Sequence, residues 1–285
     1  MGNITVKSAA IILALLFTAC STQPKNPEDI YELRNQAENQ LDIGNKLSDR
    51  GSNEEALILI NEAQRLAILT DDPSLIIRSS LSRGNILVSQ LQMQEASLEF
   101  ETALAESLQI ENRELTAVSR IHISRYMLLA GLATAQKTKE EVSGEMKFIK
   151  TDKLYIAFAW MVLGLAEKET GNFNQAETAV RQALVIHEKG RYQEQAAYDW
   201  FLIASFRSLN KNFKGARDAI KQALALDRRI ENSYGLATDW RALGDIYAKS
   251  GNAKESRAAY LRSAGIFRAL DNEDAALETE SRIQQ

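Results

Sequence analysis

The stretch Ala237-Thr-Asp-Trp-Arg-Ala-Leu-Gly-Asp-Ile-Tyr-Ala-Lys-Ser-Gly251 decides the fold, because its pattern recurs every forty residues. Forty residues earlier stands Ala197-Tyr-Asp-Trp-Phe-Leu-Ile-Ala204, and forty before that stands Ala157-Phe-Ala-Trp-Met-Val-Leu-Gly164. A fixed period of this length is typical of repeat proteins, in which each unit packs on its neighbours. We therefore expect an array of similar units.

Small residues occupy fixed columns of this repeat, and six units can be aligned on them. One column reads Gly44, Gly84, Ser124, Gly164, Ala204 and Gly244. Twelve positions further, the column reads Ala56, Ala96, Gln136, Ala176, Ala216 and Ser256. Helix axes approach to about 8 Å only where the contact residues are small. These columns predict close helix pairs, packed with large residues such as Trp160, Trp200, Trp240, Tyr247 and Tyr260.

Helix-favouring residues dominate the chain, and helix breakers are few. The 285 residues include only 14 glycines and 3 prolines, so we expect an all-α fold. Glycine recurs where the first helix of a unit should end, at Gly51, Gly131, Gly171 and Gly251. Asn or Asp recurs at the expected helix starts as N-cap, at Asp72, Asn112, Asp152, Asn172, Asn212, Asn232, Asn252 and Asn272. Each unit is predicted to be two helices of about 15–18 residues joined by tight turns.

The residue types and their spacing within the last unit resemble the signature of the tetratricopeptide repeat (TPR). The residues that carry it are Trp240, Leu243, Gly244, Tyr247, Gly251, Ser256, Tyr260 and Ser263. The forty-residue period departs from the usual 34 of that family, and its unit-ending proline is absent. The resemblance covers residues 27–285 and implies an α-solenoid of about six helix-turn-helix units with a C-terminal capping helix. The units are expected at 27–71, 72–111, 112–151, 152–191, 192–231 and 232–271, with the capping helix at 272–285.

Unit three departs from the other units. Its second helix, about residues 133–150, carries Gln136, Glu140 and Ser143 where its neighbours carry alanine or a bulky apolar residue. The simpler interpretation is a degenerate, partly exposed repeat, and the alternative is a hinge or docking surface.

The first 26 residues are expected to lie outside the repeat fold. Lys7, an apolar run over 9–17 and then small residues form the order of a signal peptide at 1–19, too short to span a bilayer permanently. The segment Phe17-Thr-Ala-Cys20 resembles the lipobox of bacterial lipoproteins, which implies that Cys20 carries lipid such as palmitate, with a tether over 20–26. Ser21 after the cysteine implies, by the same resemblance, an outer-membrane anchor that faces the periplasm. A plain signal peptide with an incidental cysteine is the alternative.

No group of residues has the pattern of a catalytic or metal-binding site. The two histidines, His122 and His187, fall on different units, and no HExxH motif, nucleophile elbow or phosphate-binding glycine loop is present. We therefore expect no catalytic residue, no metal and no cofactor. The formal net charge of −4 argues against nucleic acid as a partner, because phosphate binding needs a basic face.

In tetratricopeptide arrays the first helix of each unit lines the concave face, so the resemblance implies where a partner binds. The groove residues expected in the middle units are Val118, Ile121, Arg125, Leu128, Phe158, Met161, Leu165, Lys168, Tyr198 and Phe201. A mostly apolar strip of this kind is typical of an interaction site, and Arg125 with Lys168 is placed to clamp a carboxylate. The alternative is that the longer helices turn these residues into the core.

The leading hypothesis is a membrane-anchored, TPR-like scaffold or adaptor lipoprotein that binds a partner protein or peptide in the cell envelope. The alternative is a small-ligand-binding or transport-associated periplasmic lipoprotein that uses the groove as a pocket. An enzyme is a distant third. The identity of the partner and the oligomeric state stay open.

Overall fold

The computed structural model describes residues 32–284, and helices are the only regular elements among them. The 13 α-helices of this range are α2 (Glu32–Asp49), α3 (Asn53–Leu69), α4 (Pro73–Ser89), α5 (Met93–Gln109), α6 (Arg113–Leu129), α7 (Ala135–Met146), α8 (Lys153–Glu169), α9 (Phe173–Gly190), α10 (Gln193–Leu209), α11 (Phe213–Arg229), α12 (Ser233–Lys249), α13 (Ala253–Ala269) and α14 (Glu273–Ser281), and a 3₁₀-helix, η2 (Arg282–Gln284), follows them. The predicted all-α repeat architecture is confirmed. The expected signal peptide at 1–19, Cys20 and the tether at 20–26 lie outside the described residues.

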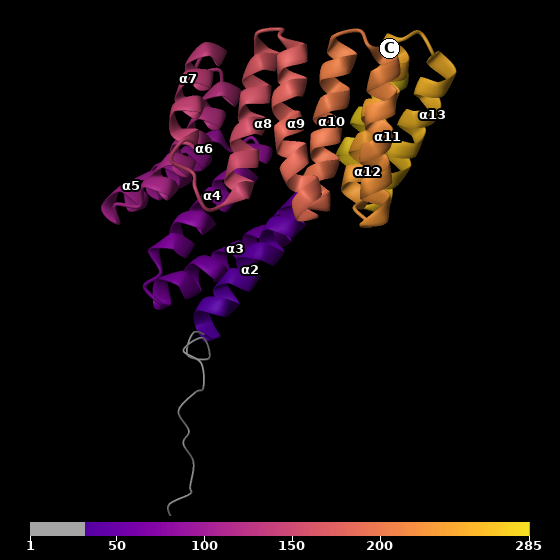
Figure 1. The fold of residues 1–285 in the computed structure, drawn as a ribbon. Coiled ribbons are helices and arrows are strands. Elements are labelled where there is room, and N and C mark those ends of the chain that lie inside the picture. Colours follow the sequence, from indigo (N-terminus) through magenta and orange to yellow (C-terminus); the bar gives the residue numbers. More distant parts are fainter. Residues whose placement is uncertain (1–31, 285) are drawn as a thin grey trace, which may run out of the picture.

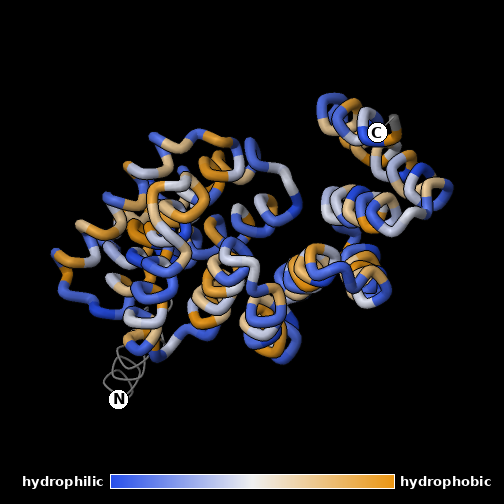
Figure 2. Tube along the Cα trace, turned by 90° about the horizontal axis from the view of Figure 1, so that it is seen from above, coloured by the Kyte–Doolittle hydropathy of each residue, from blue (hydrophilic) through white to orange (hydrophobic). Residues whose placement is uncertain are grey.

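The helices form antiparallel pairs that follow one another in chain order (Figure 1). Each even-numbered helix from α2 to α12 packs on the odd-numbered helix after it. Contacts between successive even-numbered helices join α2 to α4, α4 to α6, α6 to α8 and α10 to α12. Seen from above, the helix pairs follow one another along a curve (Figure 2). Each helix carries both apolar and polar residues along its length. None of the described helices has the length and apolar character needed to cross a membrane.

The small-residue columns lie where paired helices come closest. A Cβ atom added to Gly84 on α4 would lie 2.4 Å from the ring of Phe100, which is fully buried on α5. In the last pair, Ser256 Oγ donates a hydrogen bond of 2.9 Å to the Gly244 carbonyl oxygen. Ala176, Ala204 and Ala216 are fully buried, Gly164 and Tyr260 are buried, and Tyr247 is half-buried. The columns mark helix-to-helix contacts.

The three tryptophans are half-buried rather than central to the core. The guanidinium of Arg262 on α13 lies 4.7 Å from the ring centroid of Trp240, and that of Arg181 on α9 lies 5.7 Å from the Trp200 ring. Trp160 is likewise only half-buried. Trp200 and Trp240 therefore contact the neighbouring helices α9 and α13 through arginine side chains.

The first helix of every unit ends in the same backbone conformation. The four predicted glycines all have positive φ, from 70° at Gly131 to 80° at Gly51. Leu91 and Lys211 hold the equivalent place in their units and adopt φ values of 60° and 61° without being glycine. A left-handed residue therefore ends the first helix of every unit, because it lets the next helix reverse direction.

Six of the eight predicted N-caps accept a hydrogen bond from the backbone of the helix they start, namely Asp72, Asn112, Asp152, Asn212, Asn232 and Asn272. Asn172 and Asn252 occupy the N-cap position without capping, so the prediction of side-chain caps there is wrong. Their amide groups donate instead to the preceding turn: Asn172 to Glu167 Oε2 at 2.9 Å, and Asn252 to Ser250 Oγ at 2.8 Å.

The second helix of unit three is shorter than expected. α7 has 12 residues, whereas the expected range was about 133–150, and several of its side chains are exposed. Ion pairs hold it to its neighbours: Lys139 Nζ lies 3.2 Å from Glu167 Oε1 on α8, and Arg120 Nη1 lies 2.8 Å from Glu145 Oε1. Residues 147–152, between the end of α7 and the start of α8, form a loop instead. The Glu114 carboxylate accepts hydrogen bonds of 2.9 Å from the backbone N–H groups of Lys150 and Thr151 in that loop.

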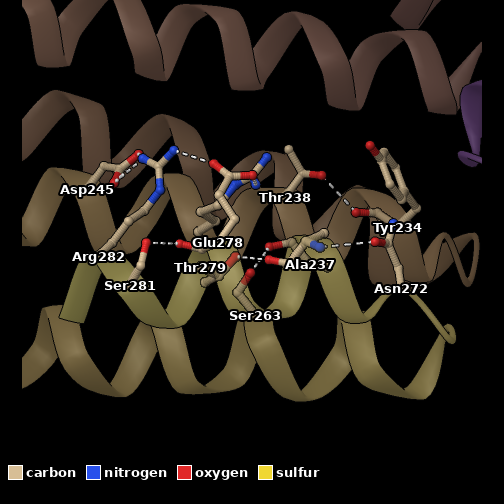
Figure 3. Close-up of polar contacts among 12 residues, drawn as sticks. Tyr234, Ala237, Thr238, Asp245, Ser263, Asn272, Glu278, Thr279, Ser281 and Arg282 are labelled. Atoms are coloured by element: carbon tan, nitrogen blue, oxygen red, sulfur yellow. Dashed lines mark hydrogen bonds and ion pairs between the residues drawn. The ribbon is translucent and has the colours of Figure 1, made fainter. Parts of the chain in front are cut away.

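The expected capping helix is α14 with η2, which covers the last helix pair (Figure 3). Arg282 binds Asp245 on α12 at 3.1 Å and Glu278 on α14 at 2.8 Å. Below this pair, Ser263 Oγ donates to the Ala237 carbonyl oxygen at 2.7 Å. Polar contacts therefore fasten the C-terminal end of the array.

The array also closes on itself. The C-terminal end of α2 reaches the start of α10, which lies about 145 residues later in the chain (Figure 1). Arg50 Nη2 lies 2.9 Å from Glu194 Oε1, and Gln195 Nε2 donates to Asp49 Oδ2 at 2.6 Å. The ring of Tyr234 on α12 lies so near Gly51 that a Cβ atom there would come within 2.5 Å of it. The inner face is thus enclosed on this side.

Candidate functional site

The inner face of the array holds a cavity of about 1110 Å³. Residues of the six even-numbered helices from α2 to α12 line it, together with the C-terminal ends of α9 and α11. The contact between α2 and α10 forms one wall. A cavity of this size is comparable to ligand-binding clefts in other proteins.

Five of the ten predicted groove residues line this cavity: Arg125, Phe158, Met161, Tyr198 and Phe201. Tyr198 is 47% exposed, and its ring stacks on that of Phe201 with centroids 6.0 Å apart. Phe158 and Phe201 are half-buried and also pack against the main core. The structure therefore brings the aromatic residues of units four and five together on one wall.

The expected groove residues of unit three are mostly core residues. Val118 and Ile121 are each 1% exposed, and Leu128 is 9% exposed. Val118 and Ile121 belong to the main hydrophobic cluster, whereas Arg125 of the same expected set lines the cavity together with its neighbour His122. Placing Val118, Ile121 and Leu128 on the groove surface is therefore wrong, because α6 is rotated so that this stripe faces its neighbours.

Leu165 and Lys168 lie outside the cavity lining. Leu165 is half-buried against the main core, and Lys168 Nζ lies 2.8 Å from Glu169 Oε1. The expected clamp of Arg125 with Lys168 is not assembled in this structure. The cavity is also less apolar than expected, because charged side chains from α2, α4, α10 and α12 line it.

Arg125 is the most unusual cation of the cavity. Its Nη1 atom donates to Asn85 Oδ1 at 3.4 Å, and its guanidinium lies 6.0 Å from the Phe158 ring centroid. Its Nε atom is buried without a hydrogen-bond partner, and within 32–284 no carboxylate oxygen lies within 4 Å of it. Burial lowers the pKa of Arg125 below its ordinary value. A cation so placed favours an anionic ligand group.

His122 lies beside Arg125 and is neutral. Its ring stacks on Phe158 with centroids 4.1 Å apart, and its Nδ1 atom lies 3.2 Å from Asn85 Oδ1. Burial, and then the charge of Arg125, lower the pKa of His122 to about 3. We infer that Nδ1 carries a hydrogen and donates it to Asn85, since the asparagine oxygen only accepts. His122 therefore packs and positions, as expected for a lone histidine.

The opposite wall of the cavity is acidic. His187 Nδ1 lies 2.6 Å from Asp199 Oδ2, and both side chains are buried. Burial raises the pKa of Asp199 above its ordinary value, and the bond to His187 opposes that rise. One unit later, Asp227 and Asp239 occupy the equivalent two positions, and they are 3% and 2% exposed. The cavity therefore has a cation, Arg125, on α6 and an acidic wall formed by Asp199, Asp227 and Asp239 on α10, α11 and α12.

Comparison with known proteins bears on the fold. No protein-family model matches the chain, and no curated protein matches it. A solved Rap protein complexed with Competence and Sporulation Factor is 13% identical, with a TM-score of 0.59 over 87% of this chain and 74% of that chain. The apo form of RapI is 16% identical, with a TM-score of 0.57 over 93% and 91%.

A variant of the nearly identical TPR-like repeats of a Podosopora anserina kinesin light chain is 18% identical, with a TM-score of 0.53 over 70% of this chain and 97% of that chain. The fold is a TPR-like helical repeat. This agrees with the signature in the last unit and with the helix pairs of every unit.

The residues of the acidic wall, Asp199, Asp227 and Asp239, are not among those predicted from the sequence. Asp199 and Asp239 each stand one position before a tryptophan, in the same column as Ser79, Ser119 and Ala159. A charged residue in a column of small residues was the signal for a polar site. No group of three or more His, Cys, Asp or Glu side chains suited to a metal ion is found among residues 32–284.

Proposed function

We propose that this protein is a TPR-like adaptor that holds a partner protein or peptide in its inner cavity. The observation that supports it best is that one cavity holds exposed aromatic surface and a half-buried arginine without a carboxylate partner among the described residues. Tyr198 and Phe201 offer the stacking surface, and Arg125 offers hydrogen-bond donors that no described carboxylate satisfies. Tyr, Phe and Arg are residues that carry binding energy at interfaces. The solved complex of the Rap protein with Competence and Sporulation Factor is consistent with this use of the fold.

We further propose that the adaptor is a lipoprotein, anchored through Cys20 to an envelope membrane and facing the periplasm. The support is the resemblance of Phe17-Thr-Ala-Cys20 to a lipobox after a signal-like segment. A tether of a few residues before the first helix would hold the cavity near the membrane surface.

A small-ligand-binding role is the second candidate, and the closure of the array favours it. The contacts of Arg50 with Glu194 and of Asp49 with Gln195 enclose the cavity on the side of α2 and α10. A cavity of about 1110 Å³ is slightly above the usual range of small-molecule pockets. Native mass spectrometry separates the candidates: a bound small molecule adds a fixed mass to the purified chain.

The adaptor hypothesis predicts that a photo-crosslinking residue at position 198 forms adducts with a partner protein or peptide in intact envelopes. Tyr198 faces the cavity, whereas Val185 is 60% exposed on the outer helix α9 and serves as the matched control position. Adding Arg125→Gln to the crosslinking chain is expected to reduce the adduct at least about tenfold, because it removes a charge-assisted hydrogen bond. Equal adducts at 198 and 185, or none at 198, contradict a partner in the cavity.

The lipid anchor predicts that cells fed radioactive palmitate label the chain, and that Cys20→Ser abolishes the label. The thiol of Cys20 is the only one in the chain, so a thioether-linked lipid has no second site. Fractionation of the same cells should find the wild-type chain with membranes and the variant released from them. Label that survives the substitution, or its absence from the wild type, disproves the anchor.

A further inference from the structure

The repeat places two buried pairs of side chains at equivalent positions of adjacent units, and the two pairs differ in charge. At the junction of α9 and α10 the pair is His187 with Asp199, in contact at 2.6 Å. At the junction of α11 and α12, forty residues later, the pair is Asp227 with Asp239. The second pair therefore has the carboxyl group of Asp227 where the first has the imidazole of His187. It lacks the hydrogen bond that joins His187 to Asp199.

The described residues satisfy only part of the hydrogen-bonding capacity of Asp227 and Asp239. Asp227 Oδ1 accepts a hydrogen bond of 3.0 Å from Asn232 Nδ2. Asp239 Oδ2 is buried and has no hydrogen-bond partner among the described residues. No lysine, arginine or histidine nitrogen within 32–284 lies within 4 Å of either carboxylate. A buried carboxyl oxygen without a partner costs free energy, so a role outside folding is the simplest reason for it.

Asp227 and Asp239 are both lining residues of the cavity, so a ligand group in the cavity lies next to them. Burial, and then the neighbouring Asp227, raise the pKa of Asp239 to about 9, and burial raises the pKa of Asp227 to about 6. Glu194 on α10 adds negative charge near Asp227. Both the unpaired Asp239 oxygen and the raised pKa values indicate that no positive group lies beside these two carboxyl groups among the described residues.

We propose that the Asp227–Asp239 pair is a subsite for a cationic group of the ligand, the ammonium or guanidinium of a lysine or arginine side chain. This inference rests on the proposed binding of a peptide in the same cavity and names the chemistry of one of its residues. The bound cation supplies the hydrogen-bond donor that His187 supplies to Asp199 in the preceding unit. It donates charge-assisted hydrogen bonds to the carboxyl groups of Asp227 and Asp239.

The test offers a pool of random hexapeptides to the full chain in detergent and identifies the retained peptides by mass spectrometry. Peptides with Lys or Arg are expected to be enriched about tenfold on the wild-type chain, as one charge-assisted hydrogen bond implies. Asp239→Asn should lose that enrichment. Asp218→Asn, at an exposed aspartate of α11, is the matched control and should keep it.

Asp227→His covers the possibility that Asp239→Asn folds poorly. It rebuilds the His187–Asp199 arrangement, so the chain should fold and still lose the enrichment of basic peptides. Retained peptides without an excess of Lys or Arg on the wild-type chain overturn the cation subsite and leave the proposed peptide binding standing.

A second probe separates the subsite from peptide binding. n-Butylguanidinium chloride, followed by NMR shifts of the Gly235 and Asp239 amides, should saturate on the wild-type chain and leave the Asp239→Asn variant unmoved. Saturation without any retained peptide supports the subsite and contradicts the proposed adaptor function. Amides that do not shift, together with no retained peptide, overturn both.

Discussion

Replacing Gly84 with alanine is expected to lower the free energy of unfolding by about 1–3 kcal/mol, the range for overpacked cores. The added Cβ atom would lie 2.4 Å from the ring of Phe100 and within 2.8 Å of two further ring atoms. Phe100 is fully buried between α4 and α6, so its ring cannot move away without opening the helix pair. The clash outweighs the gain in helix propensity that alanine brings.

The same substitution at Gly144 is the matched control. Gly144 also lies inside a helix, α7, but no atom lies within 4 Å of an added Cβ. Gly144→Ala is therefore expected to stabilise the chain by about 0.5–1 kcal/mol, since glycine disfavours helix interiors. Midpoints of urea unfolding, followed by circular dichroism, measure both effects. Similar midpoints for the two variants would show that the small-residue column is not a packing contact.

The contrast between these glycines shows how far the repeat could be predicted from the sequence. Gly84 belongs to a column that is small in every unit, and the column marks the closest approach of two helices. Gly144 belongs to no such column. The period also predicts the turns, because Leu91 and Lys211 share the column of Gly51 and adopt its left-handed conformation despite their side chains.

The cavity was predictable only in part, because it depends on how small rotations add up along the array. The expected positions hold for Phe158 and Tyr198, which line the cavity. They fail for Val118 and Ile121, which pack in the main hydrophobic cluster, whereas Arg125 from the same expected set lines the cavity. A forty-residue period fixes which residues share a face, but not the angle of that face to the axis.

The closure of the array is beyond any local pattern. Arg50 and Glu194 form an ion pair across about 145 residues, and each is an ordinary surface charge in the sequence. Only the summed curvature of the units between them brings α2 back to α10. The acidic wall was predictable in part. Asp199 and Asp239 are the charged residues in a column of small residues, but their burial depends on how the neighbouring helices pack.

Asp239→Asn is expected to make the protein relatively more stable as the pH rises. Burial raises the pKa of Asp239 from its ordinary 3.8 to about 9, so between these values the folded state holds a proton that the unfolded state has lost. The wild-type chain therefore loses stability as the pH rises through this window, and the asparagine variant lacks that loss. Each unit of pKa shift corresponds to about 1.4 kcal/mol.

Between pH 5 and pH 8 the free energy of unfolding of the variant, relative to the wild type, should rise by about 2–4 kcal/mol. Buried His122 acts in the opposite direction, since its low pKa costs stability below pH 6.5, but it is present in both proteins and cancels in the difference. Urea unfolding at pH 5, 6, 7 and 8 measures that difference. Asp218→Asn on the exposed face of α11 should show a constant difference. A constant difference for Asp239→Asn as well would mean that Asp239 is ionised throughout, with a positive charge already beside it.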